Sequence, residues 1–170
     1  MSVLALLQLS KQLSNDSDVV VQSVKLSIDS PSKYFVDHME QLKERDIDKS
    51  SKELPWIALV DGLIENGLAF EIDWQEDSQA ICEVIDNLLD MKGFSPLEWH
   101  CFEEGDYEEC TTEEFLNEVS IKLRQHSISL AFLDIDSDSY VLITVPDKEI
   151  EDLKRLSLEA GYTISDTFIT

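Results

Sequence analysis

The stretch ISLAFLDIDSDSYVLITV, residues 128–145, contains two apolar runs on either side of a polar centre at residues 134–139. Runs rich in Leu, Ile, Phe and Val that are bounded by Asp and Ser are typical of paired strands. The stretch therefore predicts a β-hairpin. Pro146 follows it and opens a segment, 147–160, whose apolar residues recur at helical spacing. A short strand over 162–168 would complete a sheet with a helix to cover it.

Apolar spacing upstream of the hairpin predicts helices around one further strand, LAFEIDW at residues 68–74. The segment DSDVVVQSVKLSI, residues 16–28, is ambiguous, because its valines recur at helical spacing but three of them are consecutive. Helix is the preferred interpretation, with Asp16 or Ser17 as its cap. The other predicted helices cover residues 2–14, 31–44, 54–66, 80–91 and 111–125.

These elements predict the α+β class: an antiparallel or mixed sheet of about four strands, covered on one face by helices, in a ferredoxin-like arrangement or a relative of it. The 170 residues suit one domain, in which an N-terminal helical segment, 1–50, precedes a sheet-containing core, 51–170.

The charge is the most pronounced global feature, since 36 acids against 13 bases give a net charge of −23. The imbalance is greatest in the middle of the chain, where residues 51–110 hold 16 acids and 2 bases. Phosphate contacts require Lys and Arg, so this field disfavours direct binding of nucleic acids, and it disfavours anionic membranes for the same reason. A basic protein is the partner that such a charge favours.

Several features predict a cytoplasmic protein. No apolar run approaches the roughly 20 residues that span a bilayer. The opening MSVLALLQLSKQLSN lacks the basic region and the cleavage site of a signal peptide. The three cysteines are an odd number without a repeated spacing, which is typical of reduced thiols.

The pattern Asp134-x-Asp136-x-Asp138 is the sharpest local motif, because alternate carboxylates begin a calcium-binding loop. The rest of that loop is missing, since Ser139 stands where a glycine is needed and Val145 where a bidentate Glu is needed. A hairpin tip whose Asp and Ser side chains satisfy the turn backbone is the favoured interpretation. A metal site at these three aspartates is the alternative.

A second set of carboxylates comprises Asp61 and Glu65, four residues apart on one predicted helical face, and Glu71 and Asp73 on the next strand. Paired carboxylates can perform acid/base chemistry or hold a divalent ion. A solvated helix face is the plainer explanation for most of them. Asp61 stands out because apolar stripe residues flank it, which places it at the edge of the core.

The segment 94–110 gives a weaker pattern, in which a short strand around 97–102 precedes an acidic loop. Acids surrounding aromatic residues can present a surface to a basic protein, because the charges speed encounter and the aromatic rings supply affinity. An ordinary solvated loop is the alternative. The candidate binding residues of this kind are Trp74, Trp99, Glu103, Glu104 and Tyr107.

No cofactor is predicted. His100, Cys101 and Cys110 do not have the paired short spacings of a structural zinc site. The sequence also lacks the glycine-rich phosphate-binding motifs, the serine nucleophile motif and the zinc-protease motif.

Three stretches resemble a bacterial family known only as a domain of unknown function: LPWIALVDGL (54–63), FEIDW (70–74) and DIDSDSY (134–140). This likeness implies a family without an assigned chemistry. Separately, the C-terminal YVLITVPDKEIEDLKRLSLEAGYTIS resembles the ferredoxin-like regulator of ribonuclease E activity, type B. That likeness implies an inhibitor that binds a protein and offers no catalytic residues to carry over.

The leading hypothesis is a non-enzymatic, acidic protein-binding or regulatory module, of immunity or inhibitor type, that masks a basic partner surface. The alternative is a divalent-metal-binding protein or a metal-dependent enzyme that uses the clustered carboxylates. The two differ in geometry, because an enzyme requires a concave site where several of those carboxylates converge.

Overall fold

The computed structural model describes residues 2–97 and 111–168. Within these residues four strands form one antiparallel sheet in the order β1–β3–β2–β4. The predicted hairpin is the β2–β3 pair, and the α+β class with about four strands is confirmed. The strands are β1 (Phe70–Asp73), β2 (Ile128–Leu133), β3 (Ser139–Pro146) and β4 (Ile164–Ser165).

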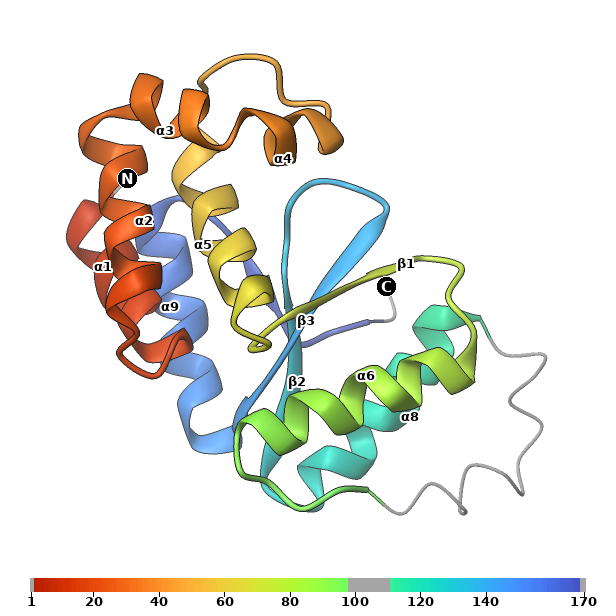
Figure 1. Ribbon diagram of the computed structural model, residues 1–170. Coiled ribbons are helices and arrows are strands. Elements are labelled where there is room, and N and C mark those ends of the chain that lie inside the picture. The colour runs from red at the N-terminus through yellow and green to blue at the C-terminus, as the bar shows by residue number, and fades with distance from the viewer. Residues whose placement is uncertain (1, 98–110, 169–170) are drawn as a thin grey trace.

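Helices supply the rest of the regular structure (Figure 1). They are α1 (Val3–Leu13), α2 (Asp18–Asp29), α3 (Pro31–Asp37), α4 (Met39–Glu44), α5 (Leu54–Glu65), α6 (Ser78–Met91), α8 (Thr112–Arg124) and α9 (Ile150–Ala160), the last preceded by the 3₁₀ turn η2 (Asp147–Glu149). Four helices begin after a residue whose side chain accepts a backbone N–H three residues on, which satisfies a donor that the first turn leaves free. These caps are Ser2, Ser17, Asp77 and Thr111.

The helices cover both faces of the sheet, not one face as expected. Alternate side chains of the central hairpin point to opposite sides, so Ala131 and Ile143 join a core with α1, α2, α5 and α9. Leu130 and Leu142 join a second core with α6 and α8. Figure 1 shows the sheet between these two helical layers.

The order of the strands explains the two-sided cover. β1 leads over α6 and α8 to β2, which is parallel to β1 with β3 between them. β3 leads over α9 to β4, parallel to β3 with β2 between them. The β1-to-β2 and β3-to-β4 connections cross the sheet in the same direction, but β1 and β3 are antiparallel. Crossovers between parallel strands are right-handed, so these two connections must pass over opposite faces of the sheet. The ferredoxin-like arrangement is therefore not confirmed.

Local expectations had mixed outcomes. The ambiguous segment 16–28 is helical from Asp18 onward, as preferred, and Ser17 caps this helix, α2. The helix expected from Pro31 is broken at His38, where φ is −119° and ψ is 21°, so α3 and α4 are separate. The expected strand over 162–168 pairs at two residues only. Most of the strand expected around 97–102 lies outside the described residues.

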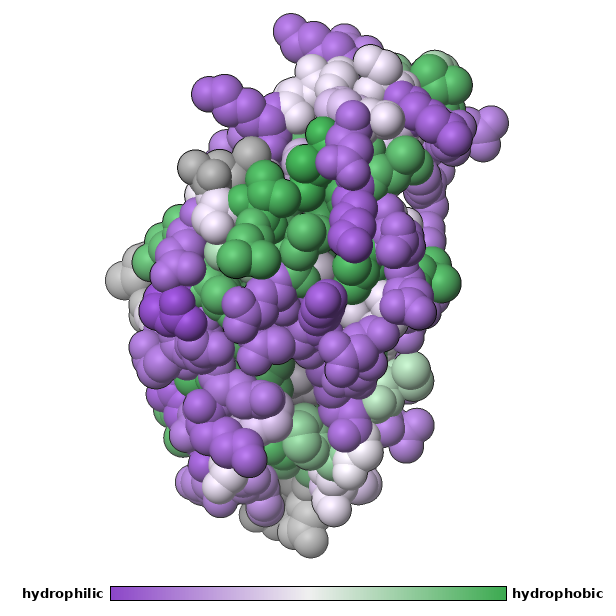
Figure 2. Space-filling view, turned by 90° about the vertical axis from the view of Figure 1, so that its left-hand side faces the viewer, coloured by the Kyte–Doolittle hydropathy of each residue, from purple (hydrophilic) through white to green (hydrophobic). Residues whose placement is uncertain are grey.

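The outer helices leave apolar side chains in solvent. Leu4 of α1 and Val19 of α2 are exposed, and Figure 2, which views this side of the molecule, shows apolar side chains grouped among polar ones. Among the described helices, none combines the length and the apolar character that a membrane crossing requires.

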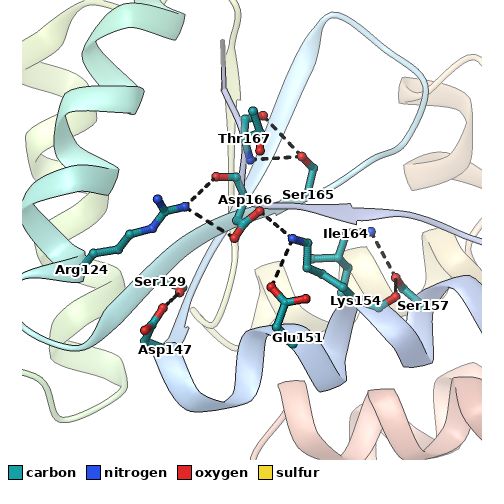
Figure 3. A network of polar contacts seen from close by, with 10 residues as sticks. All are labelled: Arg124, Ser129, Asp147, Glu151, Lys154, Ser157, Ile164, Ser165, Asp166 and Thr167. Carbon is teal, nitrogen blue, oxygen red and sulfur yellow. Dashed lines mark hydrogen bonds and ion pairs between the residues drawn. The ribbon is translucent and has the colours of Figure 1, made fainter. Parts of the chain in front are cut away.

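A polar network connects the chain just after β4 to both helical layers (Figure 3). Asp166 lies 2.8 Å from Lys154 Nζ of α9 and 3.5 Å from Arg124 Nη2 of α8. Ser157 of α9 accepts the Ile164 N–H at 3.2 Å. The chain leaves the sheet after Ser165, so these contacts hold a strand that has few ladder bonds of its own.

Asp166→Asn is expected to lower the free energy of unfolding by about 1 kcal/mol, because two partly solvated cations lose a largely buried carboxylate. Denaturant unfolding measures the change. Glu159→Gln on α9 removes an exposed ion pair with Arg155 and serves as the control. It is expected to change the free energy of unfolding little. Equal effects of the two substitutions would contradict a structural role for the network.

Candidate functional site

Arg45, at the end of α4, joins its own segment to α5 and to β1. Its Nε and Nη2 donate to Asp61 Oδ1 of α5 at 3.0 and 2.6 Å. Its Nη1 lies 2.8 Å from Glu71 Oε1 of β1. A planar guanidinium presents several donors in fixed directions, so one side chain can hold both carboxylates at once.

Most of this ion pair is removed from water, since the side chains of Arg45 and Asp61 are 17% and 14% exposed. Burial raises the pKa of the Asp61 carboxyl, and the hydrogen bonds and charge of Arg45 oppose that rise. The other oxygen, Asp61 Oδ2, is buried and has no hydrogen-bond partner among the described residues. The carboxylate therefore depends on Arg45 for its stabilisation.

Tyr34 of α3 lies buried close to this pair. Burial raises the pKa of the Tyr34 hydroxyl, and the nearby charges of Asp61 and Glu65 add to the rise. Glu65 in turn accepts a hydrogen bond from Gln41 Nε2 at 2.7 Å. The site thus gathers negative charge that Arg45 only partly balances.

Three of the four carboxylates expected to act together do converge. Asp61, Glu65 and Glu71 line one shallow pocket together with Arg45. Asp73 is not among its described lining residues. It is exposed, and its carboxylate accepts the Gln75 N–H at 3.1 Å. The convergence arises because α5 and β1 are joined by a tight turn at Gly67, whose φ of 72° suits glycine.

A larger concavity, which we call the acidic hollow, adjoins this pocket. It has a volume of about 610 Å³ and lies between the segment 44–53, the start of α5 and the tip of the β2–β3 hairpin. Figure 1 shows that tip reaching toward α4. Arg45 is the one basic residue among the described residues that line it. Its acidic lining residues are Glu44, Asp46, Glu53, Glu71, Asp134 and Asp136.

Trp56 fixes the hairpin tip beside α5. Its indole N–H donates to the Asp134 carbonyl at 2.8 Å, and its ring stacks on Tyr162 with centroids 4.7 Å apart. Burial, with a smaller effect of Glu53, raises the pKa of Tyr162 to about 12. Trp56 is thereby a core anchor that positions one wall of the hollow.

The hairpin aspartates behave as turn residues. Asp134 Oδ1 accepts the Asp136 N–H at 2.8 Å, and Asp136 has a φ of 56°, a conformation that Asp tolerates. Asp134 and Asp136 line the hollow, whereas Asp138 is exposed and is not among its described lining residues. Across residues 2–97 and 111–168 no group of three or more His, Cys, Asp or Glu is placed to hold a metal ion. The metal role of these aspartates stays a prediction.

The aromatic candidates separate into two groups. Trp74 is 53% exposed and follows β1 directly. Trp99, Glu103, Glu104 and Tyr107 lie outside the described residues, so their expected role in binding stays a prediction.

Sequence reasoning missed Arg45, which directly follows the predicted helix 31–44. A usable signal was present in Asp61, because a carboxylate flanked by apolar stripe residues needs a cation or several hydrogen-bond donors nearby. Nothing in the local pattern shows that the cation comes from a residue 16 positions earlier in the chain.

Comparison with known proteins identifies the family. A family described as a domain of unknown function (DUF6630) matches residues 5–168. The chain belongs to this family. No curated protein and no solved structure was found to match it. The expectation of a family without an assigned chemistry is confirmed, whereas bacterial origin and the likeness of the C-terminal segment to the ribonuclease E regulator stay predictions.

Arg45→Met is expected to lower the free energy of unfolding at neutral pH by about 3–5 kcal/mol, because it leaves a buried carboxylate without its cation. Urea unfolding monitored by tryptophan fluorescence measures the loss. Arg155→Met, which removes an exposed arginine of α9, is the control and should change the midpoint little. A similarly small effect of Arg45→Met would show that solvent, not Arg45, stabilises Asp61.

The raised pKa of Asp61 predicts a direction for the pH dependence of stability. The ordinary pKa of an Asp carboxyl is 3.8, and the pKa of Asp61 in the folded protein is higher. The folded protein therefore retains the Asp61 proton to a higher pH than the unfolded chain does. The stabilisation from this group is therefore complete below that value and falls as the pH rises through the folded pKa. The unfolding free energy of the wild type minus that of Asp61→Asn should decline as the pH is raised from about 4.

The matching measurement is denaturant unfolding of both proteins across that pH range. Asp138→Asn, at an exposed position of the hairpin tip, is the control. It also removes one negative charge, so it reports how stability changes when the repulsion among the protein's acids falls at low pH. A difference that increases with pH would mean that Arg45 outweighs burial at Asp61.

Proposed function

We propose that this protein is a non-enzymatic, acidic binding module that recognises a basic surface on another protein. The observation that carries the proposal is the acidic hollow, where six carboxylates from three separate segments surround a cation that two carboxylates already engage. A hollow of this kind attracts Lys and Arg side chains, because its concave wall concentrates the negative potential.

Rigidity supports a binding role for the hollow. The Arg45 ion pairs hold the end of α4 against α5 and β1, and Trp56 holds the hairpin tip against α5. Walls that are ordered before binding lose less conformational entropy when a partner arrives. The carboxylates are therefore presented in a fixed arrangement rather than on a mobile acidic tail.

The charge of the whole chain adds long-range attraction. A net charge of −23 steers cationic partners toward the protein and repels nucleic acids and anionic membranes. This steering weakens at high ionic strength, because the Debye length at physiological salt is about 8 Å. The partner class is thus a protein with clustered Lys and Arg, and an inhibitor or immunity protein that masks such a cluster is the role we favour.

The same proposal places the protein in the cytoplasm as a single domain of 170 residues. Its support is the odd set of three cysteines without a repeated spacing, which is typical of reduced thiols. The alternative of metal-dependent catalysis has weaker support, because the carboxylate of Asp134 at the hairpin tip is engaged in a turn hydrogen bond.

Capture of basic proteins from a native lysate by the immobilised protein tests the proposal. The site variant combines Glu44→Gln, Asp46→Asn, Glu53→Gln and Asp136→Asn; all four side chains are exposed, and asparagine tolerates the positive φ of positions 46 and 136. We expect the wild type to retain basic proteins at low salt and the site variant to retain roughly tenfold less. High salt should abolish retention.

The matched control removes the same four negative charges elsewhere, through Asp29→Asn, Glu83→Gln, Asp90→Asn and Glu118→Gln, all at exposed positions. It should retain nearly as much as the wild type, because the hollow is unchanged. If both variants lose retention equally, net charge acts alone and the hollow has no special role. If the wild type retains no basic protein at low salt, the proposal fails.

A further inference from the structure

β1 forms one edge of the sheet, and this edge lies next to the carboxylates of the candidate site. β1 is an outer strand that pairs with β3 on one side, and no strand of the described chain pairs with its other side. In an antiparallel strand, alternate residues direct their backbone N–H and C=O outward. Such groups form hydrogen bonds readily with an added strand.

The opposite edge differs in length and in anchoring. β4 pairs at two residues only, and the chain beyond it is held by Lys154 and Arg124 through Asp166. Figure 3 shows these side chains gathered around the segment that follows β4. A short strand anchored in this way offers an added strand little to pair with.

β1 is a short strand of four residues, FEID, and it contains neither Lys nor Pro, two residues that often protect an edge. Two aromatic side chains stand exposed at its ends, Phe70 at 40% and Trp74 at 53%. Exposed aromatic rings beside unpaired backbone groups are typical anchors for an incoming chain.

The negative charge along this edge determines which kind of strand can pair with β1. Residues 61–77 contain six acids and no base, and Glu71 is held in place by Arg45 at 2.8 Å. A second copy of this chain would bring like charges together, which opposes self-pairing. A strand that carries Lys or Arg would find opposite charges on its neighbour.

We infer that β1 is a docking edge at which an extended, lysine- or arginine-bearing segment of a partner protein adds as a fifth strand of the sheet. This inference rests on the proposed function and specifies its binding mode. Backbone hydrogen bonds to β1 supply the alignment, Phe70 and Trp74 supply apolar contact, and the surrounding carboxylates select basic side chains.

Two synthetic peptides of equal length and charge test the binding mode by isothermal titration calorimetry with the full chain. One alternates lysine with valine and can form a strand. The other alternates lysine with proline, which cannot donate to a strand ladder. We expect the lysine–valine peptide to bind at least tenfold more tightly. Its ¹³C-labelled carbonyl groups should shift to the infrared band of a β-sheet on binding.

A pair of variants locates the edge. Phe70→Thr should weaken binding of the lysine–valine peptide about tenfold and leave the lysine–proline peptide unaffected. Leu158→Thr, at an exposed position of α9, is the matched control and should change neither. Thermal melting confirms that each variant is folded.

The possible results separate the binding mode from the proposed function. Equal binding of the two peptides overturns strand addition and leaves charge recognition in place. Absence of binding by either peptide counts against both. Tighter binding of the lysine–valine peptide that Phe70→Thr leaves unchanged overturns the assignment to β1.

Discussion

The Arg45 guanidinium is the contact on which the arrangement of the candidate site depends. It lies between a carboxylate of α5 and a carboxylate of β1, and its own backbone ends α4. A buried carboxylate without a cation is costly, and a buried arginine without carboxylates is costly as well. Neither partner is stable there alone. The three segments are therefore fixed together, and the rim of the acidic hollow is fixed with them.

The fold was predictable where local spacing and chemistry agree. The hairpin, the helix with Pro55 near its start and the caps at Ser17 and Thr111 follow from short-range rules. The second helical layer was not predicted, because which face a crossover covers depends on strand order. Strand order is set by long-range pairing, such as that of Phe70 with Leu142, which no local pattern encodes.

The candidate site was predictable in part. Asp61, Glu65 and Glu71 were expected to lie together, and they do so because one tight turn joins α5 to β1. The hairpin carboxylates and this set were treated as separate groups, yet Glu71 lines the same hollow as Asp134 and Asp136. Their proximity comes from the β1–β3 pairing and from Trp56, whose hydrogen bond to Asp134 spans 78 residues. Contacts of that range lie beyond pattern-based reasoning.

The central claim is that this protein acts by binding, through carboxylates held in a fixed arrangement, and not through catalytic groups. A ¹⁵N–¹H correlation spectrum recorded during titration with tetralysine at low salt tests it most directly. We expect the largest shift changes at residues 44–53, 70–77 and 134–139, around the hollow and the β1 edge. Shift changes spread over α6, α8 and α9 in proportion to their acids would contradict the account.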